Sequence, residues 1–184
     1  AYGLLKSLTR VDQRNRYFLF GYTKSGFEWD TFRGNVREIV LRLPQRHGGR
    51  ALWEMVLVPF AARRWNLDVW FSPDFFVPKF IRIPRVVAIH DLIFMNFYDP
   101  ESKYSRDLQA KVAYAIKHAA KIVVISHHTL GDLCKAFALD KGKVAVIHLA
   151  ADERFHPIAE GLIPPVLRRY GIDFPYLHFV GEVS

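Results

Sequence analysis

The chain has 184 residues, 51% of them apolar, and a net charge of +8 from 26 Lys and Arg against 18 Asp and Glu. This length and composition exclude a disordered chain and suit one domain with a sizeable core. The lone cysteine, Cys134, excludes an internal disulfide framework and a cysteine-built zinc site, and no apolar stretch fits a membrane span or a signal peptide.

The positive charge is spread along the chain rather than gathered in one block. A basic surface attracts nucleic acid, anionic lipid or phosphorylated ligands, although it is just as often an ordinary solvated face. Basic and aromatic residues do not alternate as they do on surfaces that bind single-stranded nucleic acid. We therefore expect a membrane surface or a phosphorylated substrate, and no nucleic acid, as the partner.

The first half of the chain is predicted to alternate helices and strands. Helices are expected over residues 1–10, with Leu4, Leu5 and Leu8 on one face, and over about 50–65, with Leu52, Val56 and Phe60 at helical spacing. Pro59 is expected to kink the second helix, and Trp53-Glu54 is expected at its surface. Strands are expected over residues 17–21, 38–43 and 68–71.

The second half contains three short apolar runs, residues 86–89, 122–125 and 144–147, which predict strands buried on both faces of a parallel sheet. Between them we expect helices over about 100–120 and 126–137. Asp99 is the expected N-cap of the first, with Pro100 at its first position. Its inward side chains are expected to be Tyr104, Leu108, Val112, Ala115 and Ala119.

The end of the chain is predicted to differ from the rest. Residues 150–165 have the composition of a linker, residues 165–170 suit a short helix, and residues 176–181 suit a last strand. The alternation of strands and helices as a whole predicts an α/β fold: a doubly wound, mostly parallel sheet with helices on both faces.

Ligands of such sheets bind beyond the carboxyl ends of the strands, which here carry polar residues. His90-Asp91 follows the first buried run, and a histidine there can transfer a proton while an aspartate orients it or binds hydroxyl groups. The alternative is a histidine bonded to nearby backbone and an aspartate that caps a turn. Position favours a functional role.

Two further candidate groups lie at strand ends. Ser126 and Thr129 open a helix whose backbone N–H groups can receive a phosphate or a sugar hydroxyl, although simple capping explains them equally well. Ser72, Asp74 and Phe75 combine a carboxylate with aromatic rings, as a sugar-binding rim does, or else form a loop whose rings enter the core.

Several chemistries are disfavoured. The adjacent His127 and His128 point to different faces of a helix, so we expect no metal site. The sequence has no Gly-x-Gly-x-x-Gly, no P-loop and no Gly-x-Ser-x-Gly, which argues against a simple dinucleotide enzyme, an NTPase and a hydrolase of the common elbow type.

Taken in order, several segments resemble the group 1, or family 4, retaining glycosyltransferases, most closely their mannosyl- and rhamnosyltransferase-like members. The matching residues run along most of the chain, and their shared order and spacing are more specific than any one of them. They are Leu52-Trp53-Glu54 with Leu57 and Pro59, Asp68-Val69, Phe71 to Phe75, Val87 to Leu92, Ile122 to Ser126 with Thr129 and Leu133, Lys143 to Ile147 with Asp152, Phe155 and Pro157, and Tyr176 to Gly181.

The resemblance implies a GT-B architecture, in which two Rossmann-like domains face a cleft. It implies a hexosyltransferase that moves a sugar, with retention and without a metal or cofactor, from a nucleotide-sugar such as GDP-mannose. The implied acceptor is a saccharide or lipid-linked molecule of polysaccharide or glycolipid biosynthesis. The implied location is cytoplasmic, including a peripheral place on the inner face of the membrane.

The resemblance also assigns roles to residues. His90 would contact the donor sugar and help polarise the reacting centre. Asp91, Ser126 and Thr129, together with Ser72, Asp74 and Phe75, would line the sugar or acceptor side. Gly181 would begin the loop that approaches the donor phosphates.

The resemblance further implies that residues 1–157 form the acceptor-side domain without its first strand. Residues 158–184 would form the interdomain linker and the first strand of a donor-binding domain. The family often has Asn-Gly where this chain has Leu149-Ala150, and its donor-binding basic pair and Glu-x7-Glu region would lie beyond Ser184. We therefore expect this chain alone to be inactive.

Two other classes stay open on the sequence. One is a non-catalytic basic α/β module that binds an anionic surface or nucleic acid. The other is a different sugar-nucleotide enzyme of the same two-domain architecture, such as an epimerase.

Overall fold

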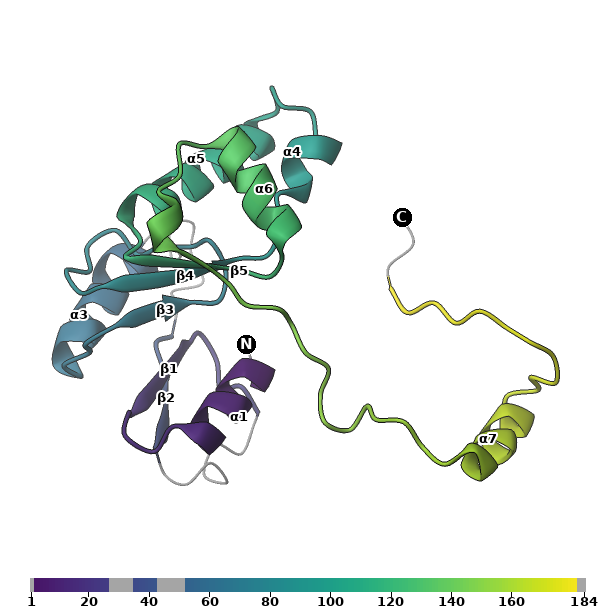
Figure 1. Cartoon of the computed structure of the whole chain (residues 1–184). Helices are drawn as coiled ribbons and strands as arrows, with labels where there is room; N and C mark the ends of the chain where they lie inside the picture. Colours follow the sequence, from purple (N-terminus) through teal and green to yellow (C-terminus); the bar gives the residue numbers. More distant parts are fainter. Residues whose placement is uncertain (1, 27–34, 43–51, 182–184) are drawn as a thin grey trace. The chain divides into compact units, whose positions relative to one another are not determined.

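The chain divides into two units, Ala1–Leu149 and Ala150–Ser184. The computed structural model describes residues 2–26, 35–42 and 52–181 of it (Figure 1). Every strand in these ranges belongs to the first unit, and all of their pairings are parallel. The predicted α/β class with parallel sheets and helices is therefore confirmed.

The first unit begins with helix α1, Tyr2–Val11, and a small parallel sheet. Its two strands are β1, Tyr17–Gly21, and β2, Val36–Val40, which pair in register from Tyr17 opposite Val36. Helix α1 and strand β1 have the predicted positions. Strand β2 begins and ends earlier than the predicted 38–43, and residues 43–51 lie outside the described residues.

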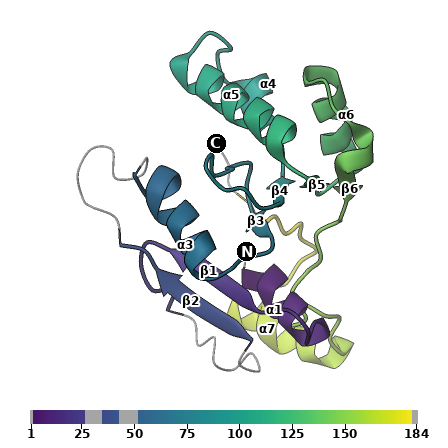
Figure 2. The ribbon, with the colours of Figure 1, turned by 90° about the vertical axis from the view of Figure 1, so that its left-hand side faces the viewer.

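A second parallel sheet follows, with its strands side by side in chain order. Helix α5, Lys103–His118, connects its second and third strands, and α6, His127–Ala136, connects the third and fourth. Both helices lie on the same side of the sheet (Figure 1 and Figure 2). The strands are β3, Trp70–Ser72, β4, Arg85–Ile89, β5, Lys121–Val124, and β6, Val144–Val146.

The larger core of the first unit lies between this sheet and its helices. Alternate residues of β4 and β5 point to the helical side, as the two-residue period of a strand requires. The central members, all almost fully buried, are Val87 and Ile89 of β4, Ile122 and Val124 of β5, Val112 and Ala115 of α5, and Leu133 of α6. Burial of these side chains is the main favourable term holding the sheet to its helices.

The expectation that all three apolar strands are buried on both faces is wrong for β6. Ala145 is exposed, and Val144 and Val146 are only half-buried. Strand β6 pairs with β5 alone among the described strands, so it is an edge strand of the sheet. Strand β4 has neighbours on both sides, and its residues Val87 to Ile89 are buried.

A smaller core joins the two sheets. Phe20 of β1 stacks on Trp70 of β3, with ring centroids 5.5 Å apart, although no backbone pairing joins these strands. Around Trp70 lie buried residues of the segment that precedes β3. They are Trp53, Val58 and Ala62, with Ile81 of the loop after β3.

The predicted face of the helix over residues 50–65 is wrong. Trp53 is buried, whereas Leu52, Val56 and Phe60 are exposed. A π-helical segment, Trp53–Leu57, precedes α3, Val58–Arg64, and its wider turn brings Trp53 and Val58 to one side. Pro59 lies in the first turn of α3, directly after the π-helical segment.

Two details around α5 also differ from the prediction. A short helix, α4, Ile93–Phe97, interrupts the expected loop, and the N-cap of α5 is Ser102 rather than Asp99. The Ser102 hydroxyl accepts a bond from the N–H of Ser105 at 3.1 Å, because residues 99–102 form a separate turn first. Tyr104 is exposed rather than inward, and Ser105 is buried in its place.

The second unit has little regular structure. A 3-10 turn, Glu160–Leu162, leads into α7, Ile163–Arg169, and Gly171, two residues after the helix, has a positive φ of 66°. The strand expected over residues 176–181 is not formed in this structure, and Leu177 is fully exposed. A strand needs a partner for its backbone groups, and no described strand pairs with this segment.

No helix in the described ranges combines the length and apolar character that crossing a membrane requires.

Candidate functional site

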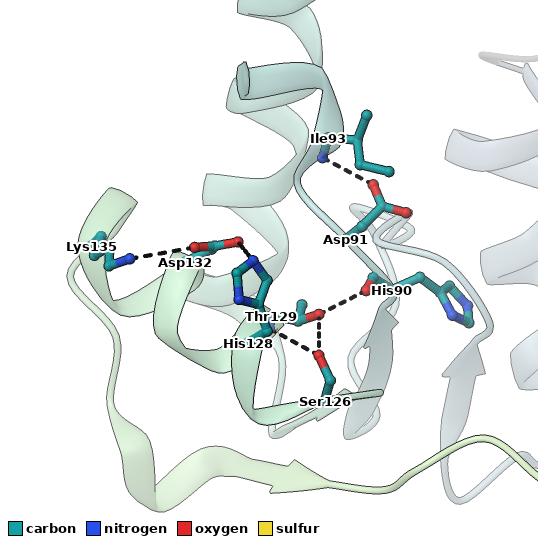
Figure 3. A network of polar contacts seen from close by, with 8 residues as sticks. All are labelled: His90, Asp91, Ile93, Ser126, His128, Thr129, Asp132 and Lys135. Carbon is teal, nitrogen blue, oxygen red and sulfur yellow. Dashed lines mark hydrogen bonds and ion pairs between the residues drawn. The ribbon is translucent and has the colours of Figure 1, made fainter. Parts of the chain in front are cut away.

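The candidate site lies at the carboxyl edge of the four-stranded sheet. His90 directly follows β4, and Ser126 follows β5 within two residues. The loop that contains Pro73 and Asp74 follows β3. Because β3, β4 and β5 are parallel neighbours, these segments emerge at the same edge. Figure 3 shows His90 and Ser126 there.

His90 is oriented by the loop after β3. Its Nε2 atom lies 2.8 Å from the carbonyl oxygen of Pro73, and a carbonyl can only accept, so Nε2 carries the proton. In the neutral ring this leaves a lone pair on Nδ1, which can accept a hydrogen bond from a ligand hydroxyl. His90 is exposed, so a ligand can reach it.

The backbone of His90 is held from the other side by the start of α6. The hydroxyl of Thr129 donates to the carbonyl oxygen of His90 at 2.9 Å (Figure 3). The Ser126 hydroxyl accepts from the backbone N–H of Thr129 at 3.0 Å, which makes it the N-cap of α6. Thr129 is almost fully buried, so this contact between two distant parts of the chain is shielded from water.

The donor and the acceptor of each hydrogen bond in this network can be assigned from the groups that it joins. The Thr129 hydroxyl has one proton and gives it to the carbonyl of His90. The two hydroxyls of Ser126 and Thr129 are 3.0 Å apart, so the proton between them belongs to Ser126. Both residues are thus engaged in capping and in holding His90.

Asp91 caps the turn between His90 and α4. Its Oδ1 atom accepts from the N–H of Ile93 at 3.1 Å, at the beginning of α4 (Figure 3). The residue is exposed, and its carboxylate lies on the segment that follows His90. A turn-capping carboxylate of this kind also offers oxygen acceptors to sugar hydroxyls.

The three residues predicted after β3 have different environments. Ser72 is buried, and its hydroxyl accepts from the indole N–H of Trp70 at 2.9 Å, so it faces the smaller core. Asp74 is exposed and its Oδ1 accepts from the N–H of Phe76 at 2.9 Å. Phe75 is half-buried against the larger core.

Gly181 lies in the second unit and is exposed there. A Cβ atom on this residue would lie 2.6 Å from the ring of Phe179, so a larger residue would require that ring to move.

Sequence reasoning missed two features of the edge. One is the Pro73 carbonyl that orients His90, a backbone group that no residue pattern marks. The other is the contact between two histidines: the ring centroids of His127 and His148 lie 5.8 Å apart, and His148 Nδ1 is 3.1 Å from the carbonyl oxygen of Ile125. The position of His148 directly after an apolar run was the signal for it.

The surface next to the site carries an ion-pair cluster and a shallow hollow. Asp132 of α6 pairs with His128 at 3.3 Å and with Lys135 at 3.7 Å (Figure 3). A hollow of about 180 Å³ is lined by Leu92, Met95, Asp132, Lys135 and Ala136. In the ranges described, no group of three or more His, Cys, Asp or Glu is placed to hold a metal ion.

Comparison with known proteins adds one match. The family model described as Glycosyltransferase Family 4 matches residues 2–155. A search of curated proteins gives no match. The matched residues include His90, Asp91, Ser126 and Thr129, which together form the carboxyl edge described above.

Proposed function

The chain belongs to glycosyltransferase family 4, and we propose that it forms the acceptor-side half of an enzyme that transfers a sugar from a nucleotide-sugar donor with retention of configuration. The proposed reaction needs no metal. The acceptor would be a saccharide or a lipid-linked molecule of polysaccharide or glycolipid synthesis. The enzyme would act in the cytoplasm or at the inner face of the membrane.

The observation that carries this proposal is the fixed geometry of His90. Two contacts from outside its own strand hold it, one from Pro73 to the ring and one from Thr129 to the backbone. A side chain held in this way is oriented before a ligand arrives, which is what positioning for catalysis requires. The free lone pair on Nδ1 suits a bond from a hydroxyl of the donor sugar.

The finer identity of the substrates rests on the resemblance alone. The similarity of residues 52–59 and 71–75 to mannosyl- and rhamnosyltransferase-like members favours a hexose donor such as GDP-mannose. Asp91 and Asp74 are exposed carboxylates beside His90 and suit sugar hydroxyls of the donor or acceptor. Residues 1–157 would form the acceptor-side domain, and Gly181 would start the donor-phosphate loop of the second domain.

The test is turnover of the natural full-length protein with nucleotide-sugar donors, measured as nucleotide released. We expect His90→Ala to lower kcat by at least about a hundredfold, the usual contribution of a positioned polar group in a transition state. The far-ultraviolet circular dichroism should not change, because His90 is exposed. The 184-residue chain alone should release no nucleotide.

His128→Ala is the matched control. The side chain of His128 is 87% exposed and pairs with Asp132 on the surface of α6, so its loss should leave turnover unchanged. Full turnover by the His90→Ala enzyme would remove His90 from the mechanism. Absence of any transfer or hydrolysis with a panel of donors would remove the proposed function itself.

A further inference from the structure

The helical segment before β3 presents a second apolar face that the described residues leave partly open to solvent. Leu52, Met55, Val56 and Phe60 lie on the side turned away from the smaller core, with exposed fractions of 43%, 45%, 51% and 67%. We call these four residues the outer face. Val58 on the inner side is fully buried, so the segment has a covered and an uncovered apolar side.

An uncovered apolar face of this kind is unusual. A helix that is apolar on all sides is normally enclosed, and contiguous exposed apolar side chains mark surfaces that bind a partner. Single exposed apolar residues are common, but these four follow one another along one side of a single helical segment. We therefore expect the outer face to bind a partner.

The positive charge next to the outer face indicates what kind of partner binds there. Arg63 and Arg64 form the last turn of α3 and are both exposed. Residues 52–64 contain one acidic residue, Glu54, and the whole chain has a net charge of +8. Apolar side chains followed by arginines match the boundary of an anionic bilayer, where acyl chains lie beneath a negatively charged layer of headgroups.

We propose that the outer face binds the surface of an anionic lipid bilayer. The four apolar side chains enter the boundary between headgroups and acyl chains, and Arg63 and Arg64 contact lipid phosphates. The inference deepens the proposed function, because it names the surface that brings the enzyme to a lipid-linked acceptor, but the binding itself involves no transfer chemistry.

The experiment is co-sedimentation of the 184-residue chain with large vesicles. One set contains phosphatidylcholine with phosphatidylglycerol, and the other contains phosphatidylcholine alone. We expect partitioning to the anionic vesicles at least tenfold stronger than to the neutral ones, and weaker at high salt. The double substitution Val56→Ser with Phe60→Ser should lower it at least tenfold, and Arg63→Gln with Arg64→Gln should weaken the preference for anionic lipid.

Three controls distinguish binding through the outer face from nonspecific hydrophobic binding and from loss of the fold. Val56 and Phe60 are exposed, so the double variant should keep the urea unfolding midpoint of the natural chain. Phe97→Ser removes an equally apolar side chain, 80% exposed, from α4 and should leave partitioning unchanged. His90→Ala should also bind vesicles fully, so failure of the transfer reaction and failure of this inference are distinguishable.

Three results would overturn the inference. The natural chain could fail to bind anionic vesicles, or the Val56→Ser and Phe60→Ser variant could bind them as well as the natural chain does. Sedimentation velocity without lipid could instead show a dimer that the same variant abolishes, which would assign the outer face to a second copy of the chain.

Discussion

Thr129 connects two segments of the chain at the carboxyl edge of the four-stranded sheet. Its backbone N–H is capped by Ser126, and its hydroxyl donates to the backbone of His90, thirty-nine residues away in sequence. The start of α6 and the end of β4 are therefore held together by a buried hydroxyl. Loss of such a bond usually costs more than its net strength, because the partner left behind is unsatisfied.

This network predicts non-additive effects on stability. Ser126→Ala and Thr129→Val should each lower the free energy of unfolding by about 1 kcal/mol. The double variant should cost less than the sum by at least about 0.5 kcal/mol, since each substitution already disrupts the other residue's bond. Urea unfolding of the four proteins measures the difference.

The comparison pair is Ser102→Ala with Thr129→Val. Ser102 caps α5 and shares no hydrogen bond with Thr129, so these two effects should add. Additivity in the Ser126 pair as well would mean that the hydroxyl network does not form in solution.

At the scale of elements, the connection from α1 to β1 depends on one carboxylate. The Asp12 carboxylate accepts from the hydroxyl of Tyr17 at 2.5 Å, from the side chain of Asn15 at 2.6 Å and from the N–H of Arg14 at 2.9 Å. These bonds, that of Tyr17 first, hold the pKa of Asp12 well below its ordinary value. Burial, together with Asp12, raises the pKa of Tyr17 to about 12.

From the contact between Asp12 and Tyr17 we expect the stability of the fold to fall at both ends of the pH range. The Tyr17 phenol has a higher pKa in the folded chain than its ordinary 10.0, so the folded state binds more protons and stability falls as pH rises from 10 to 12. The lowered pKa of Asp12 has the opposite sign, so its contribution is lost as pH falls below about 4.

Tyr17→Phe should therefore flatten the pH profile of the urea midpoint on both sides. It removes the alkaline ionisation and the largest cause of the lowered pKa of Asp12. Tyr104→Phe, at an exposed position on α5, should leave the profile as it is. A Tyr17→Phe profile that overlays that of the natural chain would contradict the pairing.

At the scale of the whole molecule, the two units differ in how much they bury. Both cores consist of residues of the first unit. Residues 150–181 are exposed apart from the half-buried Asp152, Leu167 and Ile172. Cooperative unfolding requires a buried core, so we expect it of the first unit and not of the second.

A chain of residues 1–149 should keep a cooperative urea transition and the near-ultraviolet circular dichroism of its buried Trp53 and Trp70. A peptide of residues 150–184 should show no cooperative transition. A gradual, structureless change in the first, or a sharp transition in the second, would contradict this division of stability.

Much of this architecture could be predicted from local sequence. The apolar runs before His90 and Ser126 have the length and composition of buried strands, and a parallel sheet brings such strand ends to one edge. The cap at Ser126 is equally local, because it needs only residues within one helical turn. Local patterns failed where a residue had two suitable environments, as with Asp99 and Ser102 at the start of α5.

The sequence by itself determined the α/β class, most of the helices and strands, the polar residues at the strand ends and the resemblance to family 4. The tertiary structure alone decided which side of residues 52–64 is buried, since both sides are apolar and periodicity cannot choose between them. It alone decided that residues 176–181 form no strand here, because pairing depends on a distant partner. It also placed Pro73 and Thr129 on His90, because contacts between residues far apart in the chain arise only when the sheet assembles.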